Sequence, residues 1–187
     1  MTVALWLLAI QGVIGAFDTL YYHEWRAQLP AQGRKAAPEL KLHAARDFFY
    51  AVLFGTLPWL AWEGAWVLAL VGVLVAEIIL TLTDFIVEIA VRKDLGDVYG
   101  GERVTHAIMG ILYGAMVAKL IPTLIAWWNL PTALAPMAQP IPRALTIALL
   151  AMAAGVLLSG LRDLYAALDL RGGGWPWNSR MRAGPTR

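Results

Sequence analysis

The amino-acid sequence predicts an all-α, polytopic integral membrane protein with about five transmembrane helices. Hydrophobic residues make up 59% of the chain and charged residues only 15%, whereas soluble domains usually carry about a quarter of charged residues. The apolar residues gather in five runs, each near the roughly 20 residues that a helix needs to cross about 30 Å of hydrocarbon. The chain has no cysteine, which excludes disulfides, thiolate metal sites and cysteine nucleophiles.

Turns and loops rich in proline, glycine or charge separate the five apolar runs. The runs cover residues 3–22, 48–62, 66–91, 104–128 and 144–161. The second run is short, and we expect its helix to extend backward through Leu40 and His43. Because the turn at residues 57–64 is tight, spans two and three should be antiparallel neighbours. Residues 129–142 hold four prolines, and we expect them to follow the membrane interface without regular structure.

The sequence predicts one domain followed by a tail. Residues 1–171 are expected to form a single transmembrane helical domain, and residues 172–187 a basic, flexible cytoplasmic tail. The first run has no basic segment before it and no small-residue cleavage site after it, so we interpret it as a retained span and not as a cleaved signal peptide. The loop at residues 27–38 contains prolines, a glycine and basic residues, and we expect it to be solvated.

Lysine and arginine are distributed unequally between the two predicted sides of the membrane. Of the 15 such residues, only Lys119 and Arg143 lie on the side that holds the N-terminus. Cytoplasmic loops carry the excess of basic residues in membrane proteins. The sequence therefore predicts a protein of a plasma (inner) membrane, with its N-terminus outside and its C-terminus in the cytoplasm.

Span three carries a stripe of polar residues inside an otherwise apolar helix. Glu77, Thr81, Asp84 and Glu88 follow one another at spacings of four, three and four residues, which places them on one helical face. A charged side chain costs about 3 kcal/mol at the bilayer centre on insertion scales, so each needs a partner or a function. Three carboxylates on one face repel one another, and cations or shared protons must balance them.

Three further spans carry ionisable residues at the same predicted end. In spans two and four a histidine and a carboxylate are four residues apart, which places them on one face. The candidate metal ligands at this end are Asp18 and His23 from span one, His43 and Asp47 from span two, Asp84 and Glu88 from span three, and Glu102 and His106 from span four. Span five has no ionisable residue in its apolar part. We expect it to pack outside this four-helix bundle and to contribute at most Arg162 or Asp163.

Carboxylates and imidazoles that project inward from four facing helices are the ligands of di-iron and di-manganese centres in helical bundles. These hard oxygen and nitrogen donors suit iron, manganese or zinc. The glutamate-x-x-histidine spacing of such centres is absent, because the pairs here are four residues apart. We therefore expect one or two divalent iron, manganese or zinc ions. Glu77 is a candidate proton relay beside the metal, and Tyr50 and Tyr113 are candidate catalytic residues that also suit simple packing.

The sequence leaves three classes of function open. The first is a membrane-embedded di-metal enzyme, an oxidoreductase or hydrolase acting from the cytoplasmic side on a lipophilic small molecule that enters from the lipid bilayer. The second is a transport protein that handles protons or cations, although no inverted repeat or broken-helix pair is present. The third is a structural or assembly subunit with an internal ion-pair network. No nucleic-acid groove is predicted, and an oligomer remains open.

Overall fold

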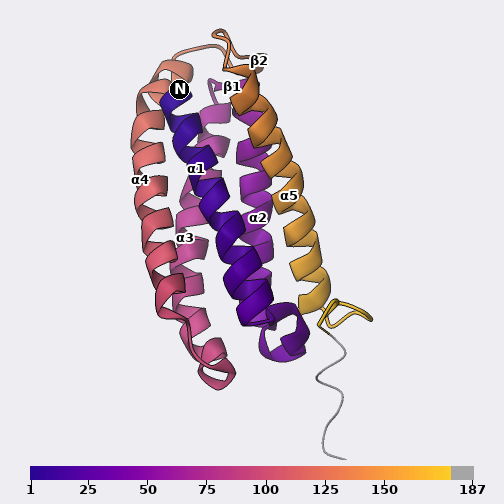
Figure 1. The fold of residues 1–187 in the computed structure, drawn as a ribbon. Helices are drawn as coiled ribbons and strands as arrows, with labels where there is room; N and C mark the ends of the chain where they lie inside the picture. The colour runs from indigo at the N-terminus through magenta and orange to yellow at the C-terminus, as the bar shows by residue number, and fades with distance from the viewer. Residues whose placement is uncertain (178–187) are drawn as a thin grey trace, which may run out of the picture.

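The computed structural model describes residues 1–177, and in it five long helices run side by side (Figure 1). The helices are α1 (Thr2–Asp18), α2 (Ala37–Thr56), α3 (Trp66–Arg92), α4 (Gly100–Trp128) and α5 (Arg143–Ala167). A π-helix, η1 (Thr19–Arg26), continues α1 without a break. Four of the five helices, with α1 and η1 taken together, are long and apolar enough to cross a membrane. The expected helical architecture is thus confirmed, and four helices have the length and composition of membrane spans.

The exception is α2, whose apolar part is short. It has 20 residues, enough for about 30 Å at 1.5 Å per residue, but four charged residues lie among its first eleven: Glu39, Lys41, Arg46 and Asp47. The helix begins before Leu40 and His43, as the sequence predicted, and it ends at Thr56. Its charged half lies at the same end of the bundle as η1.

The five helices form a ring. Helix α1 packs against α4 and α5, while α2 packs against α5 and α3, and α3 against α4 closes the ring. The most extensive contact joins α2 and α5, so α5 is not the peripheral helix that the sequence suggested. Gly160 permits this close packing, because a Cβ atom there would lie 2.9 Å from the Cβ of Asp47. Small residues at helix contacts are typical of membrane bundles.

The burial pattern is that expected of a bundle in lipid. Large apolar side chains cover the outer surface, with Ile86 and Ile111 more than 70% exposed. The interior has an apolar half, built around Leu8, Leu53 and Leu120, and a polar half near η1. In water the outer surface would be a large exposed apolar patch, so this distribution favours a membrane environment.

The apolar end of the bundle is closed by a two-stranded antiparallel sheet. Strand β1 (Leu60–Glu63) pairs with β2 (Ala133–Pro136), and Trp62 lies opposite Leu134. The sequence predicted a tight turn at residues 57–64 and an irregular stretch at 129–142, and it gave no sign that they pair. Pairing gives the facing backbone groups of both segments hydrogen-bond partners, which backbone groups shielded from water require.

Short helical segments close the polar end. These are η2 (Leu29–Lys35) and η3 (Lys93–Leu95). The loop at residues 27–38 was expected to be solvated, but Leu29 and Ala36 are fully buried, and they pack with Ala166 of α5. Of the predicted tail, residues 172–177 form turns, and Trp177 donates a hydrogen bond from Nε1 to Glu24. The remainder of that predicted tail lies outside the described residues.

Replacing Gly64 by alanine should destabilise the protein by about 2 kcal/mol or more, because two costs combine. Gly64 has a φ of 56°, and a Cβ atom added there would lie only 2.6 Å from the Cα of Thr132. The matched control is Gly72→Ala in α3, where nothing lies within 4 Å. Unfolding by denaturing detergent measures both, and equal stability of the two variants would contradict the packing of β1 against β2.

Candidate metal centre

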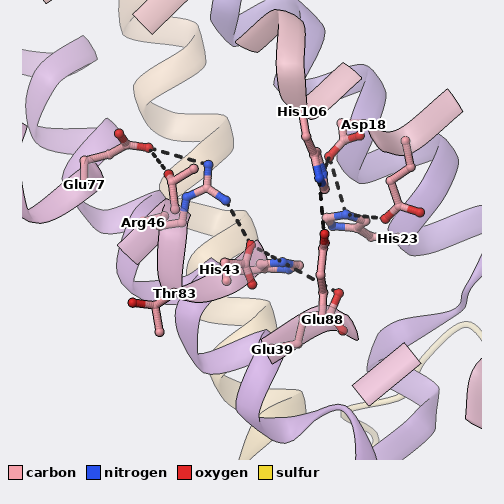
Figure 2. A network of polar contacts seen from close by, with 12 residues as sticks. Asp18, His23, Glu39, His43, Arg46, Glu77, Thr83, Glu88 and His106 are labelled. Atoms are coloured by element: carbon pink, nitrogen blue, oxygen red, sulfur yellow. Dashed lines mark hydrogen bonds and ion pairs between the residues drawn. The ribbon is translucent and has the colours of Figure 1, made fainter. Parts of the chain in front are cut away.

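A cluster of ionisable side chains fills the interior at the η1 end of the bundle. Its members come from all five helices and η1, and Figure 2 shows most of them converging. The buried members are the carboxylates Asp18, Glu39, Glu77, Asp84, Glu88, Glu102 and Asp163, the histidines His23, His43 and His106, and Arg92. Arg46 is half-buried among them. The structure thus brings together seven of the eight predicted ligands.

The predicted ligand that stays outside the cluster is Asp47. It is half-buried and lies with its Cβ beside Gly160 of α5. No ion pair joins it to the cluster among the described residues. Asp47 is one position from Arg46 in α2 and therefore points about 100° away from it around the helix. The spacing of four from His43 placed it on the same stripe, but α5 covers its side of that stripe.

The π-helix explains how α1 contributes two ligands. In an α-helix, residues five apart point about 140° away from each other. In a π-helix the backbone hydrogen bonds run between residues five apart, so such residues share a face. His23 lies in η1 five residues after Asp18, and its Nε2 is 3.4 Å from Asp18 Oδ2. Single π turns inside helices are frequent at functional sites.

The first group of candidate ligands lies between α1, η1 and α4. Asp18 Oδ2 is 3.1 Å from His106 Nε2 and 3.4 Å from His23 Nε2. Ligand atoms of a tetrahedral ion at about 2.0–2.1 Å are about 3.3 Å apart. Two of the three pairs in this group therefore have about this separation, and the ligand atoms of Asp18, His23 and His106 all lie within 4.8 Å of one another, so the group could hold one ion.

The remaining nitrogen of His106 faces a carboxylate. Glu88 Oε2 lies 3.7 Å from His106 Nδ1, and the Phe85 ring stacks on the imidazole with the ring centres 5.3 Å apart. Metal-binding histidines usually direct their second nitrogen to a carboxylate or carbonyl, which fixes the tautomer and the ring orientation. Glu88 therefore lies where it would orient His106, although the distance is beyond a hydrogen bond.

Glu102 is positioned by the beginning of α4. Its Oε2 accepts a hydrogen bond from the backbone nitrogen of Tyr99 in a capping box, an arrangement that holds the third residue of a helix against the residue before it. This leaves Oε1 to face the cluster, where it is 3.1 Å from His23 Nε2. Glu102 and His106 thus contact the cluster at two different depths, and Glu102 is the one nearer the beginning of α4.

The second group of candidate ligands surrounds His43 on α2. Its Nε2 is 3.3 Å from Asp84 Oδ2 and 3.9 Å from Glu39 Oε1. Its Nδ1 faces Asp163 Oδ2 at 3.9 Å, which repeats the arrangement of His106 and Glu88. The His43 ring stacks on that of His23 with centres 4.5 Å apart. The two groups are therefore adjacent, and His23 also forms a candidate site with Glu39 and His43.

Two arginines neutralise part of the cluster. Arg92, which is 1% exposed, donates from Nε to both carboxylate oxygens of Glu39 at 2.9 and 3.0 Å, and from Nη2 to Glu102 at 3.0 Å. Arg46 donates from Nη1 to Asp84 at 3.1 Å, and its Nη2 is 3.5 Å from Glu77. Buried carboxylates require such partners, because an unpaired charge in a low-dielectric interior is very costly.

The sequence analysis did not identify Glu39 and Arg92 as members of the cluster. A signal for each was present: Glu39 is four residues before His43, and Arg92 is four residues after Glu88. These are the spacings that placed the other members on common faces. Arg92 directly follows the apolar run of residues 66–91, and α3 continues through it.

Polar contacts extend from the cluster toward the middle of the bundle. Tyr50 donates its hydroxyl to Glu77 at 2.9 Å, and Gln11 donates from Nε2 to the same hydroxyl at 2.5 Å. Thr81 also donates to Glu77, at 2.8 Å. Tyr113 instead donates to the Leu74 carbonyl at 3.0 Å. Of the three predicted catalytic residues, Glu77 is therefore a member of the cluster and Tyr50 is hydrogen-bonded to it, whereas Tyr113 donates to a backbone carbonyl.

The cluster carries more negative charge than its arginines balance. If all seven buried carboxylates are ionised, they exceed Arg46 and Arg92 by five negative charges with neutral histidines, and by two with all three histidines protonated. Arg162 also lies 4.0 Å from Asp163, but its own partner is Glu24, outside the cluster. Several buried atoms also lack a hydrogen-bond partner: Asp18 Oδ1, His23 Nε2, Asp84 Oδ1, Glu88 Oε2 and His106 Nδ1. Such atoms are rare in folded proteins. Divalent cations or shared protons would account for both features.

Comparisons of the chain with protein-family models, with curated proteins and with solved structures found no match. What the cluster does must therefore be inferred from its own geometry and chemistry.

Replacing Arg92 by methionine should destabilise the protein by about 3–5 kcal/mol, because Glu39 and Glu102 would stay buried without their cation. Arg103→Met is the matched control. Its partner is Asp97, both side chains are more than half exposed, and such pairs contribute less than about 1 kcal/mol. Equal loss of stability in the two variants, measured by unfolding in denaturing detergent, would show that Arg92 is not the central counter-ion.

Proposed function

We propose that this chain is a membrane-embedded metalloprotein that binds two divalent transition-metal ions in the buried cluster and acts as a di-metal enzyme. One observation carries the proposal: three histidines from three helical segments meet inside a bundle among seven carboxylates that the neighbouring arginines only partly neutralise. Metal ions would supply the missing positive charge, and the unpaired nitrogen and oxygen atoms would serve as their ligands.

The donor types favour iron, manganese or zinc. Carboxylate is a hard ligand and imidazole a borderline one, and both suit these ions. The chain has no thiolate. One ion would lie among Asp18, His23 and His106, with Glu88 orienting His106. A second would lie beside His43 and Asp84. Iron would supply oxidation by dioxygen, whereas zinc or manganese would supply hydrolysis.

The proposed setting is the inner membrane, with α2 as a fifth span and the cluster on the cytoplasmic side. Helix α2 runs alongside the four apolar helices, and ten of the twelve basic residues within residues 1–177 belong to the end that holds the cluster. The outer surface of the bundle is apolar around the cluster, as at Ile86 and Ile89. We therefore propose a lipophilic substrate that reaches the site from the bilayer.

A proton- or cation-handling transport protein is the second candidate. The polar contacts that run from the cluster through Arg46 and Glu77 to Tyr50 and Gln11 favour it, since intramembrane relays use such chains. The chain of contacts stops at the apolar half of the bundle, where Leu8 and Leu120 are fully buried. A path across the whole membrane would have to pass through this layer, which makes the metal-binding function the better supported.

His106→Ala and His23→Ala should each abolish the retention of metal by the purified, membrane-inserted protein, because each removes a nitrogen ligand from the first group. Asp47→Ala is the matched control. It changes a carboxylate on α2 that lies outside the cluster, and it should retain the metal content of wild type. Elemental analysis of protein expressed with iron, manganese and zinc measures all three. Metal retained by both histidine variants, or absent from wild type, would contradict the proposed function.

A reporter that is active only in the cytoplasm should work when it is fused after Arg187, because the basic residues place this end of the chain inside. The same reporter fused before Met1 should be inactive. Each fusion is the control for the other, since both carry the same reporter on the same chain. Activity of the N-terminal fusion alone would invert the topology, and activity of both would contradict an odd number of spans.

A further inference from the structure

The two groups of candidate ligands differ in how their carboxylates are neutralised. In the first group, Asp18 pairs only with His23 and His106 among residues 1–177, and Glu88 pairs only with His106. In the second group, each carboxylate near His43 already has an arginine. Glu39 is bound by Arg92 and Asp84 by Arg46. Arg92 lies near the first group through Glu102, which is 3.1 Å from His23 Nε2, but it does not bind Asp18. A cation entering the first group therefore takes no carboxylate away from an arginine, whereas one that binds Asp84 in the second group does.

Arg46 is hydrogen-bonded to the carboxylate oxygen of Asp84 that a metal ion at the second position would bind. Its Nη1 donates to Asp84 Oδ2 at 3.1 Å, and this same oxygen is the one 3.3 Å from His43 Nε2. Figure 2 shows the guanidinium between Glu77 and the His43 side of the cluster. A divalent ion between His43 and Asp84 would lie close to the guanidinium, and the two positive charges would repel each other.

Arg46 has an alternative partner within reach. Its Nη2 lies 3.5 Å from Glu77 Oε1, and its Nε is buried without a partner. Glu77 is held in place by hydrogen bonds from Tyr50 and Thr81, so it is a fixed carboxylate to which the guanidinium can move. Arginine has five donors and a long side chain, and a small movement would exchange Asp84 for Glu77.

We infer that Arg46 regulates the occupancy of the second metal position: it is the resident counter-ion of Asp84, and a second ion binds only by displacing it toward Glu77. The ions therefore load in order, first among Asp18, His23 and His106 and then beside His43. This inference rests on the proposed function, because it assumes that the first group binds metal. Because Arg46 must be displaced, the second position binds an ion more weakly than the same ligands would without the arginine.

Titration of the metal-stripped full-length protein in detergent with Zn²⁺ tests this order. Wild type should bind one ion tightly and a second at least about ten times more weakly. Arg46→Met should tighten the second step by at least about tenfold and leave the first unchanged. Asp84→Asn should lose the second step only. Arg103→Met, which removes an exposed arginine outside the cluster, should behave as wild type.

The outcomes separate this inference from the proposed function. Two equal binding steps in wild type, or an Arg46→Met titration like that of wild type, would overturn the regulation by Arg46 while leaving metal binding intact. No binding by any variant would overturn both. A gain of affinity cannot arise from misfolding. Should Arg46→Met not insert, Arg46→Gln also removes the charge and is held to the same outcomes.

Discussion

The structure depends on the neutralisation of carboxylates that are buried inside a bundle with an apolar outer surface. A charge in such an interior is tolerated only when a cation, a proton or several hydrogen bonds compensate for its lost hydration. Arg92 does this for Glu39 and Glu102, and thereby joins α2, α3 and the beginning of α4. Asp18 and Glu88 have only histidine partners within residues 1–177. The remaining imbalance is the reason to propose metal ions.

The ring of helices serves this requirement. Each helix brings its polar residues to the same end, and the opposite end is closed by apolar side chains and by the pairing of β1 with β2. The π-helix after α1 turns His23 onto the face of Asp18, which a regular α-helix would not do. Helix α5 completes the ring and adds Asp163 beside His43. The polar cluster is therefore surrounded laterally by helices whose outer faces are apolar, and η2 and η3 close its end.

Periodicity in the sequence was sufficient to predict the helices and most of the cluster. Spacings of three and four residues reveal a common face, and they placed Glu77, Asp84 and Glu88 correctly on the inside of α3. Spacing within one helix does not reveal which helices are neighbours. The close packing of α5 on α2, which turns Asp47 away from the cluster, could therefore not be predicted. The π-helix was also missed, because an extra residue per turn leaves no distinct pattern in composition.

Positions at the ends of apolar runs were the other source of error. Arg92 directly follows an apolar run, where arginine normally marks the membrane boundary, yet it is buried and paired. The pairing of residues 60–63 with 133–136 joins segments far apart in the chain, and the four prolines of residues 129–142 argued against a strand there. Long-range pairs of this kind depend on the arrangement of the helices, which local sequence does not specify.

X-ray absorption spectroscopy at the edge of the metal bound to the purified protein tests the central claim most directly. We expect a first shell of nitrogen and oxygen atoms at about 2.0–2.1 Å, with the outer-shell scattering of about two imidazoles and no sulfur. His106→Ala should remove both the bound metal and this signal. A wild-type protein that binds no metal, or a bound metal without imidazole scattering, would contradict the claim and leave the cluster as a network of ion pairs and shared protons.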